Sequence, residues 1–119
     1  GTIKWRVPLG EDARAAKEGA RDAGVFMAER HGMIVTATGL LFVATTDGKV
    51  RAHDADTGKV LWTASLPAGS EGLPSMYEVN GRQFLVVPAS SRINTGAAAP
   101  ASEARNPQAG YVAFALPRR

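Results

Sequence analysis

Residues 34–65 read IVTATGLLFVATTDGKVRAHDADTGKVLWTAS. Short apolar segments alternate here with turn residues, and a glycine follows Thr or Asp at Gly39, Gly48 and Gly58. Strands that recur at such regular intervals with turns between them are typical of an antiparallel meander. Glycine suits these corners because it adopts positive φ without the cost of a Cβ atom. The stretch therefore predicts four antiparallel strands and leaves no room for a helix.

A second meander is predicted closer to the C-terminus. Asn80-Gly81 stands between two strand-like runs, Tyr77–Val79 and Arg82–Val87. Asn-Gly between such runs is a strong hairpin signal, because both turn residues tolerate positive φ. Gly110–Leu116 is a further strand. We therefore expect a second sheet that begins at about Met76.

Composition excludes several classes of protein. The chain has 119 residues, which is one small domain or part of a larger one. Its net charge of +3 comes from scattered residues, which argues against a nucleic-acid-binding patch. The longest apolar run, Leu40–Ala44, is far too short to span a membrane, and no segment reads as an export signal. With no cysteine there is no disulfide framework or thiolate metal site.

Two segments carry no strand pattern. Glu11–Gly24 is rich in alanine and charged residues but has no apolar stripe, so we expect a solvated helical turn or a loop. Ser90–Gln108 is rich in Ala, Ser, Pro and Asn, which predicts a long surface loop.

An internal repeat indicates the architecture. Gly1–Trp5 and Gly58–Trp62 both read Gly-x-x-x-Trp, and each is followed by a proline-containing exit. Four strands per repeat are typical of a β-propeller blade. We therefore predict an all-β chain that forms a single partial propeller domain of about two blades. Residues 1–9 would be the last strand of a preceding blade, residues 34–67 a complete blade, and residues 75–119 an incomplete final blade.

The segment Ala52–Trp62 matches the pattern Ala-x-Asp-x-x-Thr-Gly-Lys-x-x-Trp at every specified position. It resembles the tryptophan-docking motif of quinoprotein dehydrogenases, which are eight-bladed propellers that carry pyrroloquinoline quinone (PQQ). Further segments resemble the C-terminal end of the membrane-bound glucose dehydrogenase branch; they are Trp5–Gly10, Thr36-Ala37, Leu66–Gly69, Tyr77–Phe84 and Val112–Pro117. The resemblance implies that Trp62 is largely buried at a seam between sheets.

The resemblance also implies a chemistry. In the family, PQQ lies on the propeller axis, chelated to Ca²⁺ or Mg²⁺, and an aspartate takes the proton of the substrate hydroxyl. Those ligands and that aspartate belong to upstream blades, so no catalytic or metal-ligating residue is assigned here. The expected cofactor contact is the loop Thr36, Ala37 and Thr38, where the family has Thr-Ala-Gly. Glycine positions of the family are also replaced at His31 and at Ser90-Ser91, so we expect this segment alone to bind no PQQ.

Four further side chains are candidates for chemistry. His53 stands in a predicted strand, and the favoured interpretation is a surface or seam residue rather than a ligand. His31 is interpreted as a solvated loop residue. Asp54 and Asp56 lack the further ligands of a calcium loop, so they are expected to shape the turn before Gly58.

Two functional hypotheses remain open. In the first, the chain is the C-terminal part of a periplasmic quinoprotein that oxidises a sugar or alcohol of the glucose type. In the second, it is a non-catalytic propeller fragment or degenerate paralogue that serves as a structural or interaction module. The expected partner is the rest of the propeller or further copies of the chain. In the latter case Gly1–Val7 would pair beside Tyr111–Leu116, because both would otherwise leave open edges.

Overall fold

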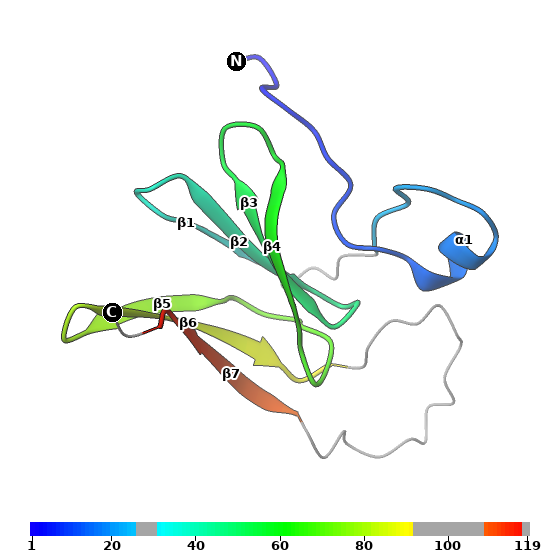
Figure 1. Ribbon diagram of the computed structural model, residues 1–119. Coiled ribbons are helices and arrows are strands. Elements are labelled where there is room, and N and C mark those ends of the chain that lie inside the picture. Colours follow the sequence, from blue (N-terminus) through cyan, green and yellow to red (C-terminus); the bar gives the residue numbers. More distant parts are fainter. Residues whose placement is uncertain (26–30, 92–108, 118–119) are drawn as a thin grey trace.

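The computed structural model describes residues 1–25, 31–91 and 109–117, and it consists of two antiparallel sheets and one short helix (Figure 1). The first sheet has four strands in the order β1-β2-β3-β4, and the second has three in the order β5-β6-β7. The all-β prediction is confirmed. The elements are α1 (Ala13–Lys17), β1 (Met33–Val35), β2 (Leu40–Thr45), β3 (Lys49–Asp54), β4 (Val60–Ser65), β5 (Ser75–Val79), β6 (Arg82–Ala89) and β7 (Gly110–Ala115).

The four-stranded sheet forms where the glycine-punctuated stretch predicted it. β2 pairs with β3 from Leu40 opposite Asp54 to Thr45 opposite Lys49. β4 pairs with β3 in the same antiparallel sense, and its register shifts after Ala52. Such an irregularity bends a strand locally and increases its twist. The outer strand β4 thus begins immediately after the corner that precedes it in the sequence.

The three-stranded sheet contains the predicted hairpin. Asn80 and Gly81 join β5 to β6 and have φ angles of 51° and 73°. Positive φ at both residues is the geometry that an Asn-Gly turn favours. β7 then pairs with β6 on the side opposite β5. The predicted long loop before β7 falls mostly on residues 92–108, which lie outside the described residues.

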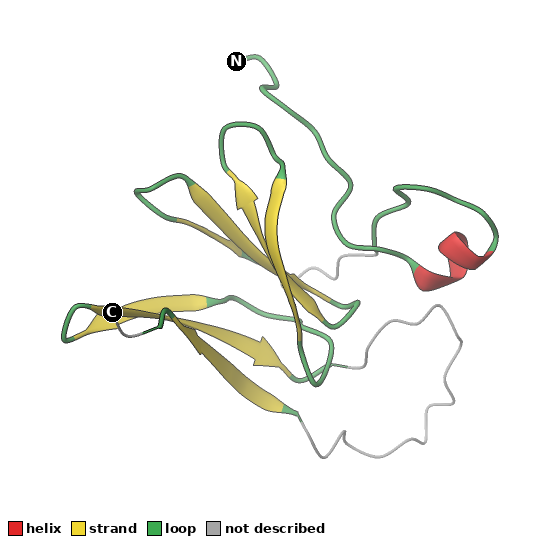
Figure 2. Cartoon of the chain, in the orientation of Figure 1, coloured by secondary structure: helices red, strands yellow, loops and turns green. Residues whose placement is uncertain are grey.

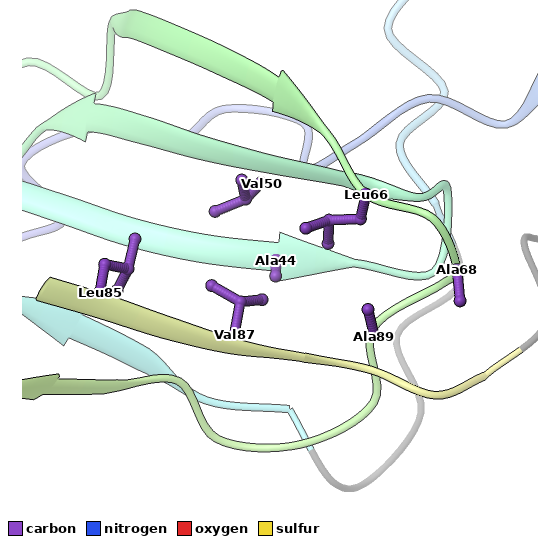
Figure 3. Close-up of a cluster of buried hydrophobic side chains, with 7 residues drawn as sticks. All are labelled: Ala44, Val50, Leu66, Ala68, Leu85, Val87 and Ala89. Carbon is purple, nitrogen blue, oxygen red and sulfur yellow. The ribbon is translucent and has the colours of Figure 1, made fainter. Parts of the chain in front are cut away.

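The core lies between the two sheets, where small side chains allow a close approach (Figure 3). The buried residues come from the first sheet, from the connection after β4 and from β6; they are Ala44, Val50, Leu66, Ala68, Leu85, Val87 and Ala89. Full burial of a valine-sized or leucine-sized side chain contributes about 1.5–3 kcal/mol. The sheets diverge toward the β5–β6 hairpin, so the layer between them is a wedge (Figure 2).

The N-terminal region differs from the prediction for residues 1–9. Gly1–Val7 forms no strand in the structure, and the three-stranded sheet has no fourth strand among the described residues. The reason is that Trp5 is held at the first sheet, far from the open edge of β7. The charged segment after it contains the one-turn helix α1, capped by the Asp12 carboxylate, which agrees with the expected helical turn.

Candidate functional site

The corner between β3 and β4, residues 54–58, is built by Asp54. Its Oδ1 accepts hydrogen bonds from the backbone N–H groups of Asp56 (2.9 Å) and Thr57 (2.8 Å). The hydrogen bond from the backbone of Thr57 is the main reason that the pKa of Asp54 is lowered. The prediction that this Asp shapes the turn is confirmed. No cluster of three or more metal-ligating side chains occurs in the part of the chain that the structure describes.

Trp5 docks on this corner. Its indole Nε1 donates to the backbone oxygen of Ala55 at 3.0 Å. The ring lies so close to Gly58 that a Cβ atom added there would be 2.6 Å from the Trp5 Cε3. Lys4 reaches Asp56 from the same segment, with 2.5 Å between Nζ and Oδ1. The corner therefore receives a tryptophan, a hydrogen bond and an exposed ion pair from residues that precede it by half the chain.

His53 lies beneath the corner and is 2% exposed. Its Nδ1 is 2.9 Å from the backbone oxygen of Gly58, and its Nε2 has no hydrogen-bond partner among the described residues. The interpretation as a surface residue is wrong, because the side chain points to the face of the sheet that the corner covers. Its role in the structure is to hold the corner rather than to meet solvent.

Trp62 occupies the next seam along the chain. Its ring meets the edge of Phe114 from β7 at a centroid distance of 5.4 Å and an interplanar angle of 86°. Aromatic pairs favour this edge-to-face arrangement. The seam position agrees with the prediction, but Trp62 is 40% exposed, so the expected burial is wrong. The physical reason is that the described residues after β7 form no corner like that of residues 54–58.

A groove opens at the wide end of the wedge, between the two sheets. It has a volume of about 450 Å³, and its lining is mostly apolar, with Trp62 and Phe114 at its centre. Thr36 and Thr38, two of the predicted cofactor contacts, line its rim. Their hydroxyl oxygens are 3.0 Å apart, and Thr36 Oγ1 also accepts from the Leu40 backbone at 3.0 Å. Ala37 is exposed and is not part of the lining.

PQQ does not match this groove. The cofactor is an anionic quinone with several carboxylates, whereas the residues that line the groove include no Lys, Arg or His. An anion in a largely apolar site needs a cation or several hydrogen-bond donors to offset its desolvation. Thr36 and Thr38 bring two hydroxyls that already satisfy each other. The described residues thus provide at most one edge of a site for this group.

Two further polar groups differ from the sequence-based interpretation or escape it. His31, expected to be solvated, is half-buried, and its Nε2 is 2.8 Å from the Ser70 backbone oxygen. Asp47 and Arg51 form a buried ion pair with 2.6 Å between Oδ2 and NH2. Burial raises the pKa of Asp47, but hydrogen bonds from Arg51 and Thr45 outweigh it and lower that pKa. An Asp at a hairpin turn with Arg four residues later was the available signal.

Comparison with known proteins decides the family. Residues 1–85 match the PQQ family described as "Glucose/ethanol/alcohol dehydrogenase, beta-propeller domain". The chain belongs to the PQQ-dependent dehydrogenases. The predicted resemblance and the propeller architecture are therefore confirmed, and the two sheets are blades of such a propeller.

Relatives in this family act on several alcohols and sugars, according to their names. The chain is 39% identical over 90 residues to the glycerol dehydrogenase large subunit of Gluconobacter thailandicus, which covers 71% of this chain and 12% of the relative. It is 40% identical over 88 residues to quinoprotein glucose dehydrogenase A of Acinetobacter calcoaceticus, covering 73% and 10%. The chain thus spans about a tenth of the length of these relatives.

Among solved structures, the chain is similar to the quinohemoprotein alcohol dehydrogenase of Comamonas testosteroni. The identity is 38%, the TM-score is 0.47, and the match covers 49% of this chain and 9% of that chain. Separately, none of the helices within the described residues is long and apolar enough to cross a membrane.

Proposed function

We propose that this chain provides propeller scaffold for a quinoprotein that oxidises a sugar or alcohol of the glucose type, with the catalytic groups in other blades. The observation that carries this proposal is the docked Trp5 on the Asp54–Gly58 corner. The contact joins a segment of one blade to the corner of the next, so it serves closure of the propeller rather than chemistry. Membership of the PQQ family supports the reaction class.

In the complete protein, PQQ would be held with Ca²⁺ or Mg²⁺ mainly by residues outside this chain. We propose that the loop of Thr36, Ala37 and Thr38 touches the cofactor only at its edge. The apolar, uncharged lining of the neighbouring groove supports this limited role. The family resemblance further places the complete protein in the periplasm.

The isolated chain tests the division of labour. The 119-residue chain is mixed with PQQ, Ca²⁺, glucose and an artificial dye acceptor, and we expect no rate above a protein-free blank. PQQ binding is measured in parallel by equilibrium dialysis with the Thr36→Ala/Thr38→Ala variant as the control. A saturable, cofactor-dependent rate, or binding that the variant abolishes, would contradict the scaffold role.

The alternative function is a non-catalytic structural or interaction module. The observation in its favour is the same uncharged groove, together with Thr38 and Ser90-Ser91 at positions where the family has glycine. The dialysis experiment extends to this alternative when it is repeated on the longest natural chain that contains these residues. PQQ binding by that longer chain supports the enzyme, and its failure to bind supports the module.

A further inference from the structure

The outer edge of β7 carries no strand among the described residues. β6 pairs along the other edge, from Ala89 opposite Gly110 to Phe84 opposite Ala115, and the sheet ends at β7. Tyr111 on this strand is 80% exposed. Backbone groups along an open edge are a template for the addition of another strand. The question is which segment has the right pattern and position to add there.

The first sheet provides the template for such an addition. β3 is the third strand of its sheet, as β7 is of the second, and their alanines Ala52 and Ala113 correspond. Ala52 lines the groove toward the following sheet. Ala113 lies on the corresponding face, because its neighbours Val112 and Phe114 pack into the core on the opposite side. The outer strand β4 pairs with β3 so that Trp62 lies opposite Ala52.

Gly1–Val7 has the pattern that this edge requires. It shares Gly-x-x-x-Trp with the segment that begins β4, and it is unpaired and largely exposed. Transfer of the β3–β4 register to β7 places Trp5 opposite Ala113. In the same register Val7 lies opposite Tyr111, as Ala64 lies opposite Val50.

This segment reaches the β7 of another copy rather than its own. Trp5 and Lys4 are tied to the corner of the first sheet by the hydrogen bond to Ala55 and the ion pair to Asp56. The N-terminus lies on the side of that sheet away from the three-stranded sheet (Figure 1). Pairing of Gly1–Val7 with an external strand leaves these contacts in place, whereas pairing with its own β7 breaks them.

We propose that copies of this chain associate head to tail, with Gly1–Val7 of one copy added as the fourth strand to β7 of the next. Each joint completes a four-stranded sheet and covers the exposed apolar face around Tyr111 and Tyr77. A head-to-tail contact closes into a ring when its rotation allows. Because propellers close with about four to eight blades and each copy brings about two, the ring holds about two to four copies. The proposal does not rest on the dehydrogenase activity.

Disulfide trapping tests both the pairing and its register. The natural chain contains no cysteine, so single-cysteine variants report on one contact at a time. Val7→Cys and Tyr111→Cys chains, one of them labelled with ¹⁵N, are mixed and mildly oxidised. Mass spectrometry then separates mixed from self-linked dimers. The control replaces Tyr111→Cys by Leu116→Cys, an exposed position just beyond the other end of β7.

We expect the mixed Val7–Tyr111 dimer to exceed the Val7–Leu116 dimer by about tenfold, because only the first pair brings two Cβ atoms within disulfide range. Light scattering of the unmodified chain at micromolar concentration should give a multiple of 12.5 kDa. Circular dichroism confirms that each variant is folded. A monomer throughout this range overturns the proposal, and so does an oligomer in which both cysteine pairs form equally or neither forms.

Discussion

The two Gly-x-x-x-Trp segments have the same pattern and opposite structures. Gly58–Trp62 leads into a paired outer strand, yet Trp62 stays 40% exposed at its seam. Gly1–Trp5 forms no strand, yet Trp5 is hydrogen-bonded and packed against the following corner. The comparison teaches that the docking motif has two separable halves. The strand half needs an open edge beside it, and the tryptophan half needs a corner on the next blade.

The difference arises from the neighbour that each tryptophan meets on the next blade. The corner at residues 54–58 offers a carbonyl from Ala55 and a glycine without a side chain. After β7 the described residues are Leu116 and Pro117, which line the groove instead of forming such a corner. Trp62 therefore gains an aromatic contact with Phe114 but no hydrogen bond from its indole among the described residues. Identical local sequence has thus met two different neighbours.

The largest expected effect comes from Gly58→Ala, which breaks the docked half. Gly58 has φ of +75°, and the added Cβ would be 2.6 Å from the Trp5 ring. Backbone strain and this clash together should lower the free energy of unfolding by about 2–4 kcal/mol. Urea denaturation followed by circular dichroism measures the loss.

Gly81→Ala is the matched control for that substitution. Gly81 has φ of +73°, and no atom lies within 4 Å of an added Cβ. It should therefore cost only the conformational strain, about 1–2 kcal/mol. Equal losses in the two variants would show that Trp5 does not occupy the corner in solution.

An intermediate effect is expected from replacing each tryptophan by phenylalanine. Trp5→Phe removes the indole hydrogen bond to Ala55, which should cost about 1–2 kcal/mol. Trp62→Phe retains an aromatic ring beside Phe114 and should cost about 0.5 kcal/mol. Thermal unfolding of both variants measures the difference. A greater loss for Trp62→Phe would reverse the assignment of which tryptophan is docked.

The smallest expected effect is a loosening of the Trp5 contact in acid. The backbone hydrogen bond from Thr57 lowers the pKa of Asp54 below its ordinary value of 3.8. The charged carboxylate therefore stabilises the corner above about pH 4, and this contribution is lost as the pH falls through the lowered pKa. Acrylamide quenching of Trp5 in the Trp62→Phe background should increase over that range.

Asp54→Asn is the control for the acid effect. Its amide oxygen still accepts from the corner but does not titrate, so the pH dependence should vanish. Asp47, whose pKa is also lowered, remains in this variant and reports on the rest of the sheet. Quenching that rises with acid to the same extent in both proteins would place the effect at Asp47 instead of the corner.

Local signals in the sequence predicted the strands and the turns. The glycines of residues 34–65 and the Asn80-Gly81 pair dictate chain reversals within a few residues, so their structural consequence is local. The Asp54 cap belongs to the same class, because donor and acceptor are two and three residues apart. The docking pattern also indicates the family without any geometry, and residues 1–85 match it.

Contacts between distant segments were decided only by the tertiary structure. Nothing local to His53 shows that it is buried under the corner, or that Trp62 stays exposed, since exposure depends on which segments pack nearby. Likewise Gly1–Val7 has the composition of a strand, but a strand exists only where an edge is available to hydrogen-bond with it. The sequence by itself determined the repeating unit and its turns. Only the tertiary structure decided which tryptophan found its corner, because that contact joins residues fifty positions apart.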